Sequence, residues 1–253
     1  MFLEIIVTMF AVGLLLGFVG AGGSGFIISV LTTVFGFPIH TSFGTALSAM
    51  AFSSFSGTVS HYREGNIVLK TGLAVGGCGA VGALIGTHYS TYIPVDELKW
   101  LTSSMLFLSG VALWIRMMLV SGKKDGDDAS AASWSGTVFW VKAIAVGLIT
   151  GTLSGLFGIG STPFIQIGLL TVLGMSTRQA AGTTMMVILP IAIAGGTGYW
   201  YVGHLDWVLL AEVVCGTMLG TFIGAKFTKR APVGLLKTAM VIVPMIGAAI
   251  LLM

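Results

Sequence analysis

Apolar runs of about 20 residues recur along the whole chain, and they constrain its fold more than any other feature. A run of that length crosses the roughly 30 Å hydrocarbon core of a bilayer as an α-helix. Only 8% of the 253 residues are charged, and the mean hydropathy is +1.00, whereas charged residues make up about a quarter of an ordinary soluble domain. We therefore predict an all-α polytopic membrane protein.

One longer hydrophilic stretch, Ser121 to Ser133, divides the chain. It predicts a first transmembrane repeat over 1–120, a hydrophilic linker over 121–136 and a second repeat over 137–253. Each repeat is expected to hold five apolar segments. They are about Phe2 to Ala21, Ser24 to Phe37, Thr41 to Ser60, Ile67 to Thr87 and Leu98 to Val120, then Val138 to Phe157, Thr162 to Met175, Gln179 to Tyr201, Trp207 to Phe227 and Val233 to Met253.

The two halves match at a fixed offset of 138 residues, the separation of Gly13 and Gly151. About ten glycine pairs keep this register, among them Gly44 with Gly182 and Gly82 with Gly220. Chance matching of apolar residues does not account for the glycines. The chain is therefore predicted to be an internal repeat.

The distribution of basic residues predicts how the two repeats are oriented. If each repeat crosses the membrane an odd number of times, nearly all basic residues fall on one side, with Lys99 as the exception. The positive-inside rule then favours an inverted repeat, a cytoplasmic linker and both termini outside. The second segment of each half reaches only about 20 Å as a helix, so we expect it to be broken or re-entrant.

Two glycine-rich stretches, GFVGAGGSGF (Gly17 to Phe26) and GLFGIGSTPF (Gly155 to Phe164), precede these short segments. Neither carries the Gly-Lys-Ser/Thr of a phosphate-binding loop. Ser24 in Gly-Gly-Ser-Gly could serve as the nucleophile of an intramembrane serine protease, but the repeat puts Thr162 at that position, so we expect no catalytic residue and no enzyme. Glycines four residues apart, such as Gly82 and Gly86, are typical of close helix packing.

The adjacent glycines instead predict a helix break at membrane depth. A break leaves backbone N–H groups free at the start of the next helix, and these groups with the positive helix end can bind an anion. Irregular backbone is tolerated at that depth where it lines a cavity or is buried in protein. The predicted substrate-binding residues are Gly22, Gly23, Ser24, Thr45, Gly160, Ser161, Thr162, Gln166 and Thr183.

Three further residues are candidates for gating or for coupling to an ion. Glu212 lies about two turns inside its apolar segment, and a charge at such a position is a functional hypothesis by default. His61 and Arg63 follow the third segment, where they could gate or simply flank the helix. The two cysteines, Cys78 and Cys215, lie in apolar runs and suggest neither a disulfide nor a metal site. We expect no metal and no cofactor.

The paired Gly-x-x-Gly-x-Gly segments, Gly17 to Gly22 and Gly155 to Gly160, each precede a short apolar helix and a helix with Gly-Thr. In this arrangement the chain resembles the sulfite exporter TauE/SafE family, the 4-toluene sulfonate uptake permeases. The resemblance implies a bacterial or archaeal inner-membrane permease for sulfite, sulfoacetate or other organosulfonates, coupled to an ion gradient. Gly23 and Gly25 depart from Ser161 and Pro163 of the second copy.

The sequence thus predicts a secondary transporter for small sulfur-containing anions, with the anion near the membrane midplane. The alternatives are a passive channel for anions or small solutes and, more remotely, the Ser24 protease. The surplus of three positive charges lies in short loops and favours a membrane protein over nucleic-acid binding. The expected partners are a small anion and membrane lipid, with homo-oligomer formation as an option and no nucleic acid.

Overall fold

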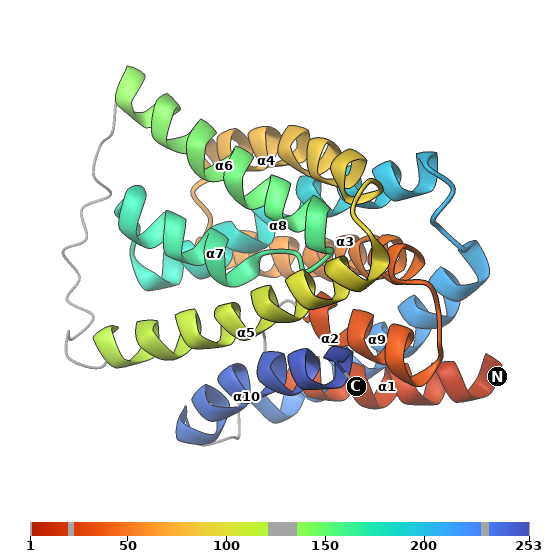
Figure 1. Ribbon diagram of the computed structural model, residues 1–253. Helices are drawn as coiled ribbons and strands as arrows, with labels where there is room; N and C mark the ends of the chain where they lie inside the picture. The colour runs from red at the N-terminus through yellow and green to blue at the C-terminus, as the bar shows by residue number, and fades with distance from the viewer. Residues whose placement is uncertain (1, 20–22, 121–135, 229–232, 253) are drawn as a thin grey trace.

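The computed structural model describes residues 2–19, 23–120, 136–228 and 233–252, and every element in these ranges is helical (Figure 1). The first half contains α1 (Phe2–Val19), α2 (Ser24–Ser29), η1 (Val30–Val34), α3 (Ile39–Arg63), α4 (Leu69–Ser90) and α5 (Val95–Val120). The second contains α6 (Thr137–Phe157), α7 (Thr162–Ile167), η2 (Gly168–Val172), α8 (Thr177–Tyr201), α9 (Trp207–Thr228) and α10 (Val233–Leu252).

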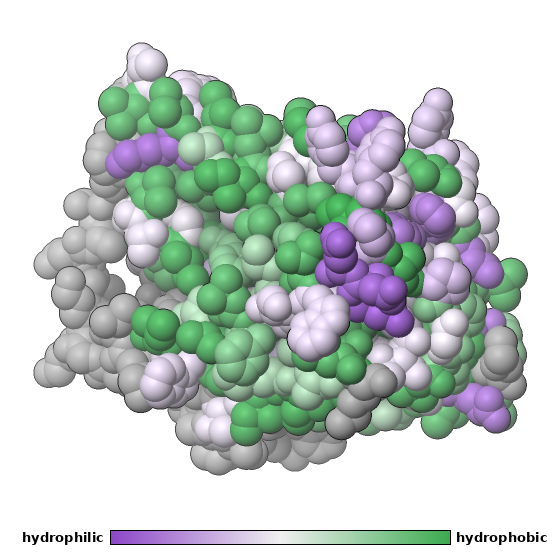
Figure 2. Space-filling model, in the orientation of Figure 1, coloured by the Kyte–Doolittle hydropathy of each residue, from purple (hydrophilic) through white to green (hydrophobic). Residues whose placement is uncertain are grey.

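The helices have the length and composition of membrane spans. Within the described residues, four are long and apolar enough to cross a bilayer: Leu69–Ser90, Val95–Ile115, Thr137–Phe157 and Gln179–Tyr201. On the face that Figure 2 shows, hydrophobic side chains cover much of the surface, and strongly hydrophilic ones gather in small patches. The prediction of an all-α polytopic membrane protein is confirmed. The linker at 121–136 falls almost entirely outside the described residues.

Corresponding helices begin at positions that differ by the 138 residues found in the sequence. α3 begins at Ile39 and α8 at Thr177, and α4 and α9 begin at Leu69 and Trp207. Packing follows the same correspondence, because α1 lies along α9 while α6, its counterpart, lies along α4, the counterpart of α9 (Figure 1). The pair of α1 from the first half and α9 from the second thus corresponds to the pair of α6 from the second half and α4 from the first.

Glycines allow these helices to approach closely. A β-carbon at Gly82 of α4 would lie 2.6 Å from the Leu148 carbonyl oxygen of α6. In the corresponding pair, a β-carbon at Gly13 of α1 would lie 2.7 Å from the Thr217 carbonyl oxygen of α9. Real β-carbons do not approach backbone so closely, so these contacts require glycine.

α3 and its counterpart α8 pack against one another in an antiparallel arrangement. Gly44, near the start of α3, faces Tyr199 near the end of α8, whereas Gly57 farther along α3 faces Met185 near the start of α8. The pair α5 and α10 is also antiparallel, since Ser103 Oγ donates to the Ala248 carbonyl at 2.7 Å and Gly110 approaches Val241. An inverted repeat requires this direction, and the inverted repeat itself stays a prediction that the packing supports.

The second segment of each half is a short helix. α2 runs into the π-helical turn η1, and α7 runs into η2, with Phe35 N–H bonded to the Val30 carbonyl and Leu173 N–H to the Gly168 carbonyl. Gly36 (φ 71°) and Gly174 (φ 63°) then turn the chain. From Ser24 to Val34, such a helix covers only about half of a 30 Å hydrocarbon core.

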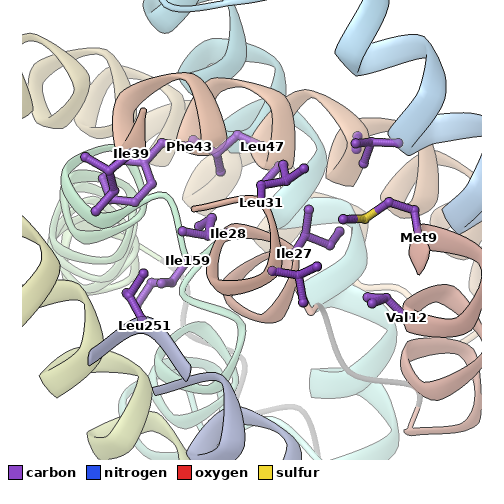
Figure 3. Close-up of a cluster of buried hydrophobic side chains, with 14 of the residues drawn as sticks. Met9, Val12, Ile27, Ile28, Leu31, Ile39, Phe43, Leu47, Ile159 and Leu251 are labelled. Atoms are coloured by element: carbon purple, nitrogen blue, oxygen red, sulfur yellow. The ribbon is translucent and has the colours of Figure 1, made fainter. Parts of the chain in front are cut away.

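One side of the first short helix is buried in the core of the molecule. Ile27, Ile28 and Leu31 of α2 and η1 pack among side chains from distant parts of the chain (Figure 3). The labelled neighbours are Met9, Val12, Ile39, Phe43, Leu47, Ile159 and Leu251. The buried starts of α2 and α7, Ser24 and Thr162, thus lie inside protein, where irregular backbone can be tolerated at membrane depth.

Candidate functional site

The break in the second half lies between α6 and α7. Gly158 ends α6 with a left-handed conformation (φ 66°), and Gly160 (φ 63°) and Ser161 (φ 45°) are also left-handed. Ser161 is the only non-glycine residue with positive φ in the described ranges, and that conformation is strained for a side chain with a β-carbon. α7 then begins at Thr162 with Pro163 in its first turn, where a missing N–H is harmless.

The break in the first half lies between α1 and α2. Gly22, one of the predicted site residues, lies outside the described residues, and Gly23 precedes the first residue of α2. Gly23 has φ −103°, so it does not share the left-handed conformation of its counterpart Ser161. Ser24 is 1% exposed. The two breaks therefore share their position in the repeat but differ in local backbone.

The fold brings the two breaks together. A β-carbon at Gly160 would lie 3.1 Å from Ser24 Oγ, so the start of α2 borders the loop before α7. The same β-carbon would collide with the thioether of Met50 in α3. Sequence reasoning identified Gly160 and Ser24 separately, and the structure places them in one site with Met50, which no sequence signal indicated.

The site lies near the middle of the spanning helices. Met50 is close to the midpoint of α3, and Gly25, the second residue of α2, faces Leu106 close to the midpoint of α5. α5 contains a stretch with the length and composition of a membrane span, and the helix start at Ser24 lies level with the middle of that stretch. A polar site at that depth is expected to be functional.

Several buried hydroxyls around the breaks have no hydrogen-bond partner among the described residues. They belong to Ser24, Ser154, Ser161 and Thr162, each at most 3% exposed. A buried polar group without a partner costs about 1–3 kcal/mol, and such groups are rare in native proteins. These hydroxyls can therefore donate to a bound anion or to water. Ser154, one turn before Gly158, was not predicted from the sequence.

The Gly-Thr pairs of α3 and α8 lie against the turns between helices. A β-carbon at Gly44 would lie 2.6 Å from the His204 carbonyl oxygen, and one at Gly182 would lie 2.5 Å from the Asn66 carbonyl oxygen. Thr183 Oγ1 accepts a hydrogen bond from Val68 N–H at 3.1 Å, just before α4. The hydroxyl of Thr45 is fully buried and, within the described ranges, has no partner.

The remaining predicted residues are spread over the molecule. Gln166 is half-buried in α7. Glu212 of α9 is 6% exposed, and its Oε2 lacks a partner among the described residues. His61 lies at the end of α3 with Nδ1 3.7 Å from Glu64 Oε2, and Arg63 is exposed beside it. None of the described residues form a His, Cys, Asp or Glu cluster that could hold a metal ion.

A polar cluster holds the end of α6 near the second break. The buried Tyr199 hydroxyl donates to the Gly155 carbonyl at 2.7 Å and lies 3.0 Å from Ser90 Oγ. The Ser90 carbonyl is 3.1 Å from His40 Nε2, and the His40 ring stacks on His204. Burial, and secondarily the charge of His40, lower the pKa of His204 in the turn after α8.

A hollow of about 380 Å³ lies between the ends of α4 and α8, lined by Leu84, Thr87, His88, Thr197, Gly198, Trp200, Tyr201 and Val202. Its lining is mainly apolar, and it contains none of the residues at the two breaks. The hollow is therefore separate from the candidate site.

The fold and the paired helix starts define a multi-pass helical membrane protein with a polar site near mid-depth. The family model described as sulfite exporter TauE/SafE matches residues 5–251, and the chain belongs to that family. The prediction of that family from the paired glycine segments is confirmed.

Curated relatives support the same class. The chain is 48% identical over 248 residues to the "Probable membrane transporter protein YdhB" of Bacillus subtilis, covering 98% of this chain and 99% of the relative. It is 26% identical over 242 residues to a "Probable membrane transporter protein" of a Sinorhizobium species, covering 95% and 89%. No solved structure matches. The protein is a membrane transporter and not an enzyme, so the protease alternative for Ser24 is rejected.

Proposed function

We propose that the protein is a secondary permease for small sulfur-containing anions such as sulfite, sulfoacetate or other organosulfonates. The observation that carries the proposal is the closeness of Ser24 Oγ to Gly160, where a β-carbon would lie 3.1 Å from it. The start of α2 in the first half is therefore next to the loop that leads into α7 in the second half. Each start presents backbone N–H groups that lack an intrahelical partner. A single anion between them would be stabilised by both positive helix ends.

The side chains suit a sulfonate or sulfite group. Ser24, Ser161 and Thr162 supply buried hydroxyls without partners among the described residues, so they can donate to several oxygens of one anion. A helix end carries roughly half an elementary charge, and two together match the single negative charge of one sulfonate group. The remaining proposed contacts are Gly22, Gly23, Thr45, Gln166 and Thr183.

We further propose that the permease lies in the inner membrane as an inverted repeat, with the linker in the cytoplasm and both termini outside. The antiparallel packing of α3 against α8 and the one-sided distribution of basic residues support this topology. Coupling to an ion gradient would involve Glu212, whose carboxylate is buried and incompletely hydrogen-bonded within the described chain. A buried carboxylate in a membrane helix can take up and release a proton.

The anion site is tested by thermal shift on purified protein with sulfite, sulfate, thiosulfate, taurine, sulfoacetate and isethionate. A ligand that binds only the native state raises its apparent stability. We expect a sulfonate or sulfite to raise the melting temperature of the unaltered protein, and Gly160→Ala to abolish the shift, because its methyl group would occupy the space beside Ser24.

Gly36→Ala is the matched control for this experiment. Gly36 also has a positive φ, 71°, but a β-carbon there would meet no atom within 4 Å. It should lower stability through backbone strain while leaving the ligand-induced shift intact. Equal shifts in both variants would contradict an anion site at Gly160. Exchange of labelled for unlabelled anion in proteoliposomes separates a carrier from the alternative of a passive channel, since only a carrier shows counterflow.

A further inference from the structure

The second half of α3 carries a row of serines that its counterpart helix lacks. Ser53, Ser56 and Ser60 are spaced by three and four residues, so they share one side of the helix, which we call the serine flank. All three are exposed. The residues at the corresponding positions of α8 are Ile191, Ala194 and Gly198, which carry no hydroxyl and are buried or half-buried.

The difference arises from the helix that covers each flank. α4 packs along α8, where Ile191 Cδ1 would lie 2.6 Å from a β-carbon at Gly79 and Thr87 approaches Gly198. The corresponding pair, α9 and α3, makes a much smaller contact. Leu209, Leu210 and Val213 at the start of α9 belong to the same core cluster as Ile39, Phe43 and Leu47 in the first half of α3.

α9 therefore leaves the serine flank uncovered. The described core clusters include residues of α3 only as far as Ala51. Beyond that point the helix exposes two different surfaces. Phe52, Phe55 and Val59 form an apolar surface suited to lipid, and the serine flank lies beside it.

Hydroxyls and hydrocarbon are a poor match, because lipid chains offer no hydrogen-bond partner. Ser53 Oγ donates to the Met50 carbonyl at 3.0 Å, which leaves its acceptor sites open. Water between α3 and α9 would bond those sites and the hydroxyls of Ser56 and Ser60. The inner end of the flank also leads to the candidate site. Ser53 is one helical turn after Met50, and Met50 borders Gly160 and the buried hydroxyl of Ser24, which has no partner within the described ranges. The outer end of the flank is at His61 and Arg63.

We propose that the serine flank lines a water-filled vestibule by which the anion passes between the membrane face at Arg63 and the two helix starts. The passage of an anion rests on the proposed function, but the vestibule itself does not. Ser53, Ser56 and Ser60 offer hydroxyl donors at successive depths along the helix. His61 stands at the mouth of the vestibule, where its counterpart Tyr199 is fully buried.

Thiol labelling tests the vestibule. The background variant is Cys78→Ala/Cys215→Ala, which removes both native thiols. Ser53→Cys, Ser56→Cys and Ser60→Cys are then reacted in native membranes with sulfonatoethyl methanethiosulfonate, a charged reagent that reacts only with thiols in water. We expect each to react at least tenfold faster than Ile191→Cys and Ala194→Cys, the counterparts on the covered flank of α8.

Phe55→Cys and Val59→Cys distinguish a vestibule from a lipid-facing surface. Both positions are exposed, but they face hydrocarbon, where a thiol stays protonated and the charged reagent does not enter, so both should react slowly. If the three serine-flank cysteines react with the charged reagent as slowly as Phe55→Cys, the flank faces lipid and the inference is wrong.

Protection by sulfoacetate separates this inference from the proposed function. If sulfoacetate slows labelling of Ser53→Cys more than that of Ser60→Cys, the vestibule leads to an anion site. Fast labelling without protection by any compound of the thermal-shift panel would support the vestibule and contradict the proposed anion specificity. Normal circular dichroism of each variant establishes that slow labelling does not come from misfolding.

Discussion

The end of α8 and the corresponding end of α3 occupy equivalent places in the two halves, yet they are packed differently. Tyr199 is fully buried and bonded to Gly155, whereas His61, 138 residues earlier, is half-exposed and lies 3.7 Å from its near neighbour Glu64. In both halves the glycine near the other end of the helix meets the backbone of a turn. The two halves thus have the same kind of backbone contact at one end of the helix, while side-chain packing at the other end buries Tyr199 and leaves His61 half-exposed.

The largest expected effect is at the contacts that both halves share. Gly44→Val and Gly182→Val would each force a side chain into a turn carbonyl, of His204 and Asn66 respectively. Overpacking against backbone that cannot move aside costs about 3 kcal/mol. We expect similar losses of stability in both variants, measured by thermal unfolding in detergent.

Gly77→Val controls for the substitution itself, because a β-carbon at Gly77 of α4 would meet no atom within 4 Å. It should leave the melting temperature almost unchanged. A large loss of stability in only one of Gly44→Val and Gly182→Val would show that the backbone contacts of the two halves are not equivalent.

A smaller and unequal effect is expected where the halves differ. Tyr199→Phe leaves the Gly155 carbonyl without its donor, and an unsatisfied buried group costs about 2 kcal/mol. His61→Phe removes a half-exposed side chain and should cost less than about 0.5 kcal/mol. Thermal unfolding of the two variants side by side measures the difference. Equal losses of stability would mean that the side chain at the end of α3 is packed as tightly as the one at the end of α8.

The smallest effect is a dependence of stability on pH through His204. Its lowered pKa means that the unfolded chain, with an ordinary histidine pKa of about 6.5, binds a proton more readily than the folded protein. The stabilising contribution is therefore complete above about pH 7. This contribution is lost as the pH falls below the histidine pKa of the unfolded chain and then through the lowered pKa of His204 in the folded protein.

His204→Asn, which copies the corresponding residue Asn66, should remove this part of the pH dependence. The melting temperature from pH 8 to pH 5 provides the measurement. His88→Asn, at an exposed histidine of α4, should leave the slope unchanged. A slope that survives in His204→Asn would assign the effect to another group.

Much of this architecture could be predicted from the sequence, because hydrophobicity and glycine spacing are local properties. Apolar runs predicted the helices. The 138-residue register between Gly44 and Gly182 predicted that α3 and α8 would occupy corresponding positions in the two halves. The family followed from the paired glycine segments. The short second helices were also expected, since Ser24 to Val34 cannot span a bilayer.

The site was predictable only in part. Ser24 and Gly160 stood out because a serine or a glycine cluster at membrane depth is unusual, but their mutual approach depends on helix packing between the halves. Met50 and Ser154 carried no signal, since an apolar residue in a helix and a serine near a helix end are both ordinary. The hydroxyls of α3, Ser53 among them, are suited to line a cavity, but the sequence could not tell which lie uncovered, because hydroxyls in a helix often bond to their own backbone.

The sequence by itself determined that this is a helical membrane protein, and it predicted two matching halves with a break before each short helix. Local composition decides these features, because the bilayer selects for apolar length and glycine selects for backbone freedom. Only the tertiary structure decided that the two breaks adjoin and that α4 covers its flank while α9 does not. Such contacts join residues more than a hundred positions apart, and they depend on how whole helices pack.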